Sequence, residues 1–143
     1  MKPNIIMIMT DQQRYDTIKE LGFEYMITPN FDELVKGGTT FENTFCPGAT
    51  CIASRAAMFT GMYPHNTGVY SFDDWSHHYT WVNDLRDNGY YCVNLGKMHT
   101  SPMYAENGFD ERRVVENEAS LLFERHIPQD EWGNFLMDHG IRR

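Results

Sequence analysis

A cysteine and an arginine one helical turn apart lie in "TCIASRAAMFTG", residues 50–61, a segment that is typical of a helix. Thr50 is predicted to cap its N-terminus and Gly61 to end it. Cys51 would then lie in the first turn, where backbone N–H groups and the helix dipole favour anions. Arg55 would add positive charge on the same face. The pattern predicts an anion-binding position, although a small buried thiol and an arginine paired with a surface acid fit the same spacing.

Further polar residues follow two predicted strands. Residues 4–10, "NIIMIMT", form an apolar run that predicts a strand buried on both faces, and Asp11 and Gln12 come directly after it. Residues 90–96, "YYCVNLG", predict a second buried strand, which Lys97 and His99 follow. Ligand sites in open α/β sheets lie beyond the carboxyl ends of strands. These residues are therefore expected to approach one site, although a helix cap at Asp11 and an ordinary loop at residues 97–99 are the plainer interpretations.

The elements around these residues alternate between helix and strand. A helix is predicted from Thr28, with Pro29 at its first position, to Gly37 or Gly38, and a strand over residues 39–45. A second helix is predicted from Thr80 to Gly89, and the tail over 116–143 reads as mostly helical. The alternation predicts an α/β fold with a mainly parallel sheet flanked by helices.

Composition limits the functional classes. With 143 residues, 41% of them hydrophobic, the chain fits one domain. The net charge of −8 argues against a nucleic-acid partner. The opening residues contain no run long enough for a membrane span and no cleavage signal, so a cytoplasmic protein with no membrane partner is expected. The three cysteines are irregularly spaced, which predicts free thiols.

The segment "CIASRAAMFTGMYPHNTGV", residues 51–69, resembles the signature of the type I sulfatases, C-x-P/A-S-R followed by T-G-x-Y-P-H-x-x-G. These enzymes belong to the alkaline-phosphatase-like superfamily. "PNIIMIMTDQQ", "TPNFDELVKGGTTFENTF" and "GYYCVNLGKMH" are similar to further family segments, in the family's order. The resemblance implies an alkaline-phosphatase-like core, and it implies that residues 1–143 are the N-terminal part of a sulfatase catalytic domain.

The resemblance also implies a chemistry. Cys51 would be oxidised by a separate maturation enzyme to formylglycine, an aldehyde whose hydrate attacks the sulfur of a sulfate ester. The position of Ala53 is more often Pro in the maturation motif, so conversion is expected to depend on the host. Arg55 would orient the hydrate, Lys97 would bridge hydrate and sulfate, and His99 would accept a proton from the second hydroxyl when sulfate leaves.

A divalent metal completes the implied site. Asp11 and the oxygens of converted Cys51 would bind it, and Gln12 would add an amide oxygen where many relatives have a second Asp. Calcium is expected, with magnesium, manganese and zinc as alternatives. Gln12, Lys97 and His99 would also contact the substrate, a sulfated small molecule or carbohydrate.

Asp138 and His139 look like the acid and histidine that complete the family's metal site from a later strand. We interpret them instead as the end of a helix, because Trp132, Phe135 and Leu136 have helical spacing and Gly140 follows as a stop signal. The metal site would then be incomplete in residues 1–143, which are expected to be inactive alone. Uncovered sheet surface would favour self-association.

Two alternatives to a sulfatase remain open at this stage. A phosphonate monoester or phosphodiester hydrolase of the same superfamily uses the same nucleophile and often has an Asp-Gln opening like residues 11–12. A truncated, non-catalytic anion-binding module would keep the helix N-terminus without the reaction.

Overall fold

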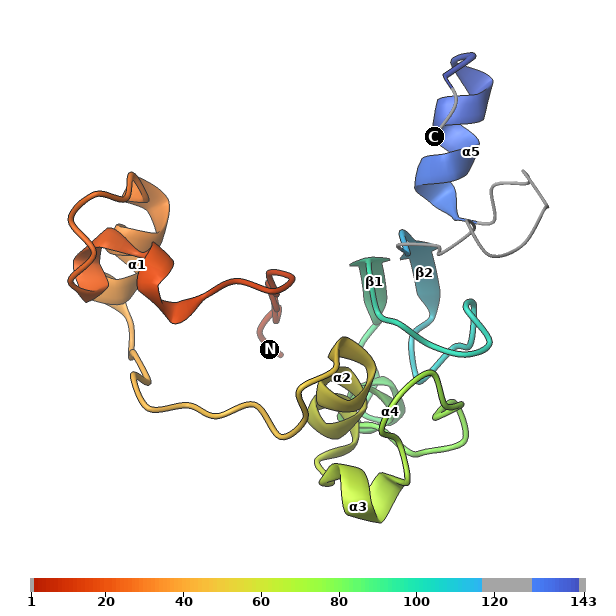
Figure 1. Cartoon of the computed structure of the whole chain (residues 1–143). Coiled ribbons are helices and arrows are strands. Elements are labelled where there is room, and N and C mark those ends of the chain that lie inside the picture. The colour runs from red at the N-terminus through yellow and green to blue at the C-terminus, as the bar shows by residue number, and fades with distance from the viewer. Residues whose placement is uncertain (1, 117–129, 142–143) are drawn as a thin grey trace. The chain divides into compact units, whose positions relative to one another are not determined.

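The computed structural model describes residues 2–116 and 130–141. The chain forms two compact units, an N-terminal unit of residues 1–45 and a C-terminal unit of residues 46–143 (Figure 1). Among the described residues, no helix is both long enough and apolar enough to cross a membrane.

In its described part, residues 2–45, the N-terminal unit contains three short helices. Two are 3-10 turns, η1 (Tyr15–Thr17) and η2 (Lys19–Leu21), and the third is α1 (Pro29–Gly37). The hydroxyl of Thr28, the predicted N-cap residue, accepts from Lys19 N at 2.9 Å and donates to Asp32 Oδ1 at 2.9 Å. Asp32 is buried. One hydroxyl and one carboxylate therefore attach η2 to α1.

The two strands predicted in this unit are absent from the structure. Residues 4–10 and 39–45 have no regular secondary structure. The apolar side chains of the first run are exposed, and Ile6 keeps 84% of its surface. A strand exists only through hydrogen bonds to a neighbouring strand, and the described part of this unit supplies none. The prediction of a strand buried on both faces at residues 4–10 is wrong for this structure.

Helices open the C-terminal unit. α2 (Cys51–Thr60) begins after Thr50, whose hydroxyl accepts from Ala53 N, and it ends at Gly61 in the left-handed conformation, as predicted. The single turn α3 (Pro64–Thr67) follows. α4 (Trp81–Asp87) begins with a capping box between Thr80 and Asn83. Local cap signals thus predicted α2 and α4 correctly.

The sheet of this unit is a parallel pair. β1 (Val93–Gly96) pairs with β2 (Glu111–Val114), with Val93 opposite Glu111 and Gly96 opposite Val114. β1 confirms the predicted strand but corrects its burial, because Val93 is 43% exposed and Leu95 74% exposed. A parallel strand pair with helices is consistent with an α/β fold and represents a small part of one.

The core lies between the helices and the loops that precede β1. Phe59 from α2 is its centre, stacked on Trp81 at 5.4 Å between ring centroids and on Trp75 at 6.1 Å. The buried apolar residues around it are Ile52, Ala56, Val69, Val82, Cys92 and Met98. Because Ile52, Ala56 and Phe59 come from α2, burying this core fixes the orientation of the helix that carries Cys51.

The last element is α5 (Glu131–Asp138), capped by Asp130, whose side chain accepts from Gly133 N. Asp138 ends this helix and His139 follows as its C-cap. The helical interpretation of this segment is confirmed, and the absence of a metal-binding role for these two residues stays a prediction. The rest of the predicted helical tail, residues 117–129, lies outside the described residues.

Candidate active site

Cys51 and His99 are in contact although 48 positions separate them in the sequence. Cys51 is the first residue of α2, and its Sγ lies 3.0 Å from His99 Nδ1. Both side chains are half-buried. The thiol here is the unmodified cysteine, so its sulfur marks the place that the oxygens of a converted residue would occupy. A histidine nitrogen at this distance can exchange a proton with a group on residue 51.

Arg55 and Lys97 form the second contact of the cluster. Arg55 is buried, with 6% of its surface exposed, and its Nη1 donates to the main-chain oxygen of Lys97 at 2.6 Å. A guanidinium bonded to this carbonyl fixes the chain just after β1. The structure therefore brings the side chains of Cys51 and His99 together and places Arg55 on the main chain of Lys97, while the catalytic roles of the four residues stay predictions.

His99 has an unusual main chain. Its φ is 61°, and three residues earlier Gly96 has a φ of 102°. Positive φ is uncommon for a residue with a Cβ and persists when surrounding contacts hold it. One such contact is Trp75 Nε1, which donates to His99 O at 3.0 Å. Phe72 packs edge-on against the imidazole, with 5.7 Å between ring centroids.

The loop after His99 is fixed by Arg112 of β2. Its Nη1 donates to Thr100 Oγ1 at 3.0 Å, to Met103 O at 3.1 Å and to Ala105 O. Burial lowers the pKa of this guanidinium from its ordinary value, and the negative charge of Glu116 opposes that change. Arg112 thus ties residues 100–105 to the strand pair.

Asp11 and Gln12 belong to the N-terminal unit, where both are exposed and Gln12 has a φ of 50°. A carboxylate and an amide oxygen are donors that suit a hard divalent cation, so the chemistry of this pair fits the predicted metal. Within residues 2–116 and 130–141, no three or more histidine, cysteine, aspartate or glutamate side chains gather as a metal site.

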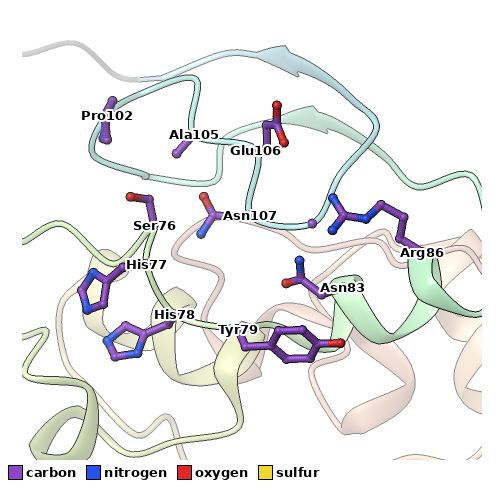
Figure 2. A pocket seen from close by; sticks show the side chains of 11 residues that line it. Ser76, His77, His78, Tyr79, Asn83, Arg86, Pro102, Ala105, Glu106 and Asn107 are labelled. Carbon is purple, nitrogen blue, oxygen red and sulfur yellow. The ribbon is translucent and has the colours of Figure 1, made fainter.

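A cavity of about 570 Å³ lies elsewhere in the C-terminal unit (Figure 2). Its walls come from residues 76–79, from α4 and from residues 102–108. None of the four clustered residues is among those that line it. His77 and His78 lie here in a turn, and His78 Nε2 is 3.1 Å from Thr67 O. The contact between Cys51 and His99, not this cavity, therefore locates the candidate site.

Three residues that support the site were not singled out from the sequence. Trp75 was part of an aromatic stretch with no distinctive signal, and Arg112 and Glu116 belong to no motif. Glu116 accepts from the backbone N–H groups of Met98 and His99. Only the register of the strand pair reveals that residues near 112–116 reach the 97–100 loop.

Comparisons with known proteins give one consistent result. The family model described as "Sulfatase" matches residues 3–133. That range covers most of each unit and includes all six predicted site residues.

Individual relatives agree with this match. An arylsulfatase of Clostridium perfringens is 36% identical over 129 residues, which cover 88% of this chain and 26% of that protein. A choline-sulfatase of Rhizobium meliloti is 33% identical, over 80% of this chain and 23% of that protein. Arylsulfatase A of Homo sapiens is 38% identical over 48% of this chain and 13% of that protein. The chain spans about a quarter, or less, of the length of these relatives.

Proposed function

The chain belongs to the sulfatase family, and from that premise we propose that it supplies the nucleophile and part of the catalytic cluster of an enzyme that hydrolyses sulfate esters. Membership implies the alkaline-phosphatase-like α/β fold, of which the β1–β2 pair and its helices form a part. The proposal concerns the activity of the protein that contains these residues.

One observation carries the proposal. Cys51 begins a helix, where the dipole favours an anion, and its Sγ lies 3.0 Å from a histidine nitrogen brought from the end of another element. We propose that Cys51 is converted to formylglycine by a maturation enzyme. One hydroxyl of its hydrate attacks sulfur while the alcohol of the ester leaves, and a sulfated residue 51 results.

His99 has the geometry for the second half of the reaction. Its Nδ1 would accept the proton of the remaining hydroxyl on residue 51, so that the carbon–oxygen bond to sulfate breaks and the aldehyde re-forms. Arg55 Nη1 donates to Lys97 O at 2.6 Å, which fixes the main chain two residues before His99. The Lys97 ammonium would then offset negative charge on the transferring sulfate.

A divalent metal, calcium or one of its alternatives, would be held by Asp11, Gln12 and the oxygens of converted residue 51, and it would supply Lewis-acid activation of the sulfate group. The donor types of Asp11 and Gln12 support this assignment. The arylsulfatase and choline-sulfatase names of the relatives support a sulfated small molecule as substrate, and a sulfated carbohydrate is the alternative.

We also propose that residues 1–143, produced alone, self-associate and lack activity. Ile6 is 84% exposed and Leu95 74% exposed, and apolar side chains left in water favour association. Size-exclusion chromatography over a range of protein concentrations measures the self-association. A monomer at every concentration would contradict that part of the proposal.

The test of function uses a full-length form of the protein, co-expressed with a formylglycine-generating enzyme. Peptide mass spectrometry establishes the conversion of Cys51, and hydrolysis of 4-nitrophenyl sulfate is measured. We expect Cys51→Ala to abolish hydrolysis. The matched control is Cys46→Ala, because Cys46 is an exposed thiol outside the cluster and its loss should leave the rate unchanged.

The same assay separates the alternatives. Asp11 followed by Gln12 is the observation that favours a phosphorus substrate, so a phosphonate monoester and a phosphodiester are assayed beside the sulfate ester. Faster Cys51-dependent turnover of the phosphorus substrates would overturn the sulfatase proposal. A thiol that stays unconverted, together with no metal binding by calorimetry, would favour a non-catalytic anion-binding module.

A further inference from the structure

Glu116 contacts the main chain of the loop that carries His99. Its side chain is buried, with 6% of the residue exposed. Its Oε1 accepts from Met98 N at 3.0 Å and from His99 N at 2.6 Å. Two successive backbone N–H groups thus converge on one carboxylate oxygen, an arrangement that binds anions well. The anion here is the protein's own side chain.

These contacts explain how His99 keeps its main-chain conformation. Its φ of 61° is one that a residue with a Cβ seldom adopts without support. Hydrogen bonds to a carboxylate are stronger than those to a neutral acceptor, particularly away from water. Glu116 therefore holds the N–H side of His99, while Trp75 holds its carbonyl oxygen at 3.0 Å.

With both ends of the residue held, the direction of the imidazole is largely determined. The ring then needs only its side-chain torsions to place Nδ1 at 3.0 Å from Cys51 Sγ. The edge of Phe72 limits those torsions further. A change in the acceptor at position 116 would rotate the main chain of His99 and so move Nδ1 away from residue 51.

Glu116 is itself held from two directions. The strand register pairs Gly96 with Val114, so the chain two residues beyond each strand end runs alongside as Met98 and Glu116. Beyond the strand, Glu116 N donates to Asp130 Oδ2 at 3.0 Å. Asp130 is fully buried, and its Oδ1 also caps α5 by accepting from Gly133 N at 2.6 Å. A series of hydrogen bonds therefore connects α5 to His99 through the side chains of Asp130 and Glu116.

We propose that Glu116 is a positioning residue for the sulfatase reaction, which sets the main chain of His99 and thereby the place of its imidazole beside residue 51. This role rests on the proposed function. Glu116 touches neither substrate nor residue 51 in this role and acts only through His99.

The test is a double-mutant cycle in converted full-length protein with 4-nitrophenyl sulfate. Glu116→Gln keeps the shape of the side chain but replaces the charged acceptor. Because a misplacement of about 1 Å at a reacting group can cost about 100-fold, we expect kcat to fall about 10- to 100-fold with KM changed less than about threefold. In a His99→Ala background, Glu116→Gln should change kcat by less than about twofold.

The matched control is Glu111→Gln, a carboxyl on the same strand pair whose side chain contacts Arg113 and Tyr91. It should leave kcat unchanged. Wild-type kcat in Glu116→Gln would overturn the proposal, and so would an equal fold-loss with and without His99, which is the signature of a general structural role. If Glu116→Gln does not fold, Glu116→Asp, which keeps the charge and shortens the reach, takes its place in the cycle with the same criteria.

A readout without turnover separates this inference from the proposed function. In unconverted protein labelled with ¹⁵N-methionine and ¹⁵N-histidine, the amide signals of Met98 and His99 should move upfield in Glu116→Gln, since a charged acceptor is lost. Their constancy would overturn the contact. If converted protein shows no Cys51-dependent hydrolysis at all, the proposed function fails, and these two amide signals still decide whether Glu116 holds the loop.

Discussion

The two units of this chain are built on different principles. The C-terminal unit has a buried aromatic core around Phe59, and the residues of the candidate site lie on elements that this core fixes. The N-terminal unit is held by polar contacts around Asp32, while its most apolar run stays exposed. The difference shows that an apolar run in the sequence forms a buried element only where other segments of the chain cover its side chains.

The largest effect should follow the loss of the core's central ring. Phe59→Ala removes a ring stacked on two tryptophans and is expected to lower the free energy of unfolding of the C-terminal unit by about 3 to 5 kcal/mol. Urea denaturation followed by tryptophan fluorescence measures this, because all three tryptophans lie in that unit. A loss below about 1 kcal/mol would mean that the two units do not differ in the way described.

The helix caps give a smaller and more discriminating comparison. Thr50→Ala removes an acceptor for Ala53 N and a donor to Tyr70 O at 3.0 Å, so a loss of about 1 kcal/mol is expected in the C-terminal unit. Thr28→Ala removes two hydroxyl contacts between η2 and α1 in the N-terminal unit. Its effect should appear as loss of helical circular dichroism with the tryptophan transition unchanged. A shift of that transition by Thr28→Ala would show that the units unfold together.

Helix caps could be predicted from the sequence, whereas strands could be predicted only in part. The starts of α2 and α4 were predicted correctly because a threonine cap and a terminal glycine act within a few residues. The strand predicted at residues 4–10 does not form in the structure, because a strand depends on hydrogen-bond partners that are distant in the sequence. The cluster of Cys51 with His99 followed from motifs of the family, whereas Glu116 could not be predicted, since its contact arises only from the register of β1 with β2.

The exposed run gives a direct test of this explanation. In the chain of residues 1–143, Ile6→Ala should change the free energy of unfolding by less than about 0.5 kcal/mol, because Ile6 is 84% exposed. In a longer form of the protein that covers this run as a strand, the same substitution should cost about 2 to 5 kcal/mol. Equal effects in the two forms would contradict the idea that missing partners keep this run uncovered.

The smallest effect concerns alkaline pH. Partial desolvation of its hydroxyl raises the pKa of Tyr79 to about 12, although the residue is 58% exposed, and hydrogen bonds from this hydroxyl to Asp84 and Asp87 act in the same direction. Between pH 10, its ordinary pKa, and about 12 the unfolded chain loses this proton while the folded chain keeps it. Stability from this group is therefore present below pH 10 and falls as the pH rises to 12.

Denaturation of the parent and of Tyr79→Phe over this pH range isolates the contribution. The variant should lose less stability between pH 10 and 12 than the parent, because phenylalanine carries no titrating hydroxyl. The same pH dependence in both proteins would show that Tyr79 gains nothing from its two acidic neighbours.

The parallel register of β1 and β2 also limits which changes of chain length the protein can accept. Residues 101–109 form a loop between the two strands, so added residues there would extend the loop and leave the pairing intact. One residue added between Val114 and Glu116 would instead turn the carboxylate to the opposite side of the extended chain, away from Met98 and His99. Insertions and deletions should therefore avoid the two residues that precede Glu116.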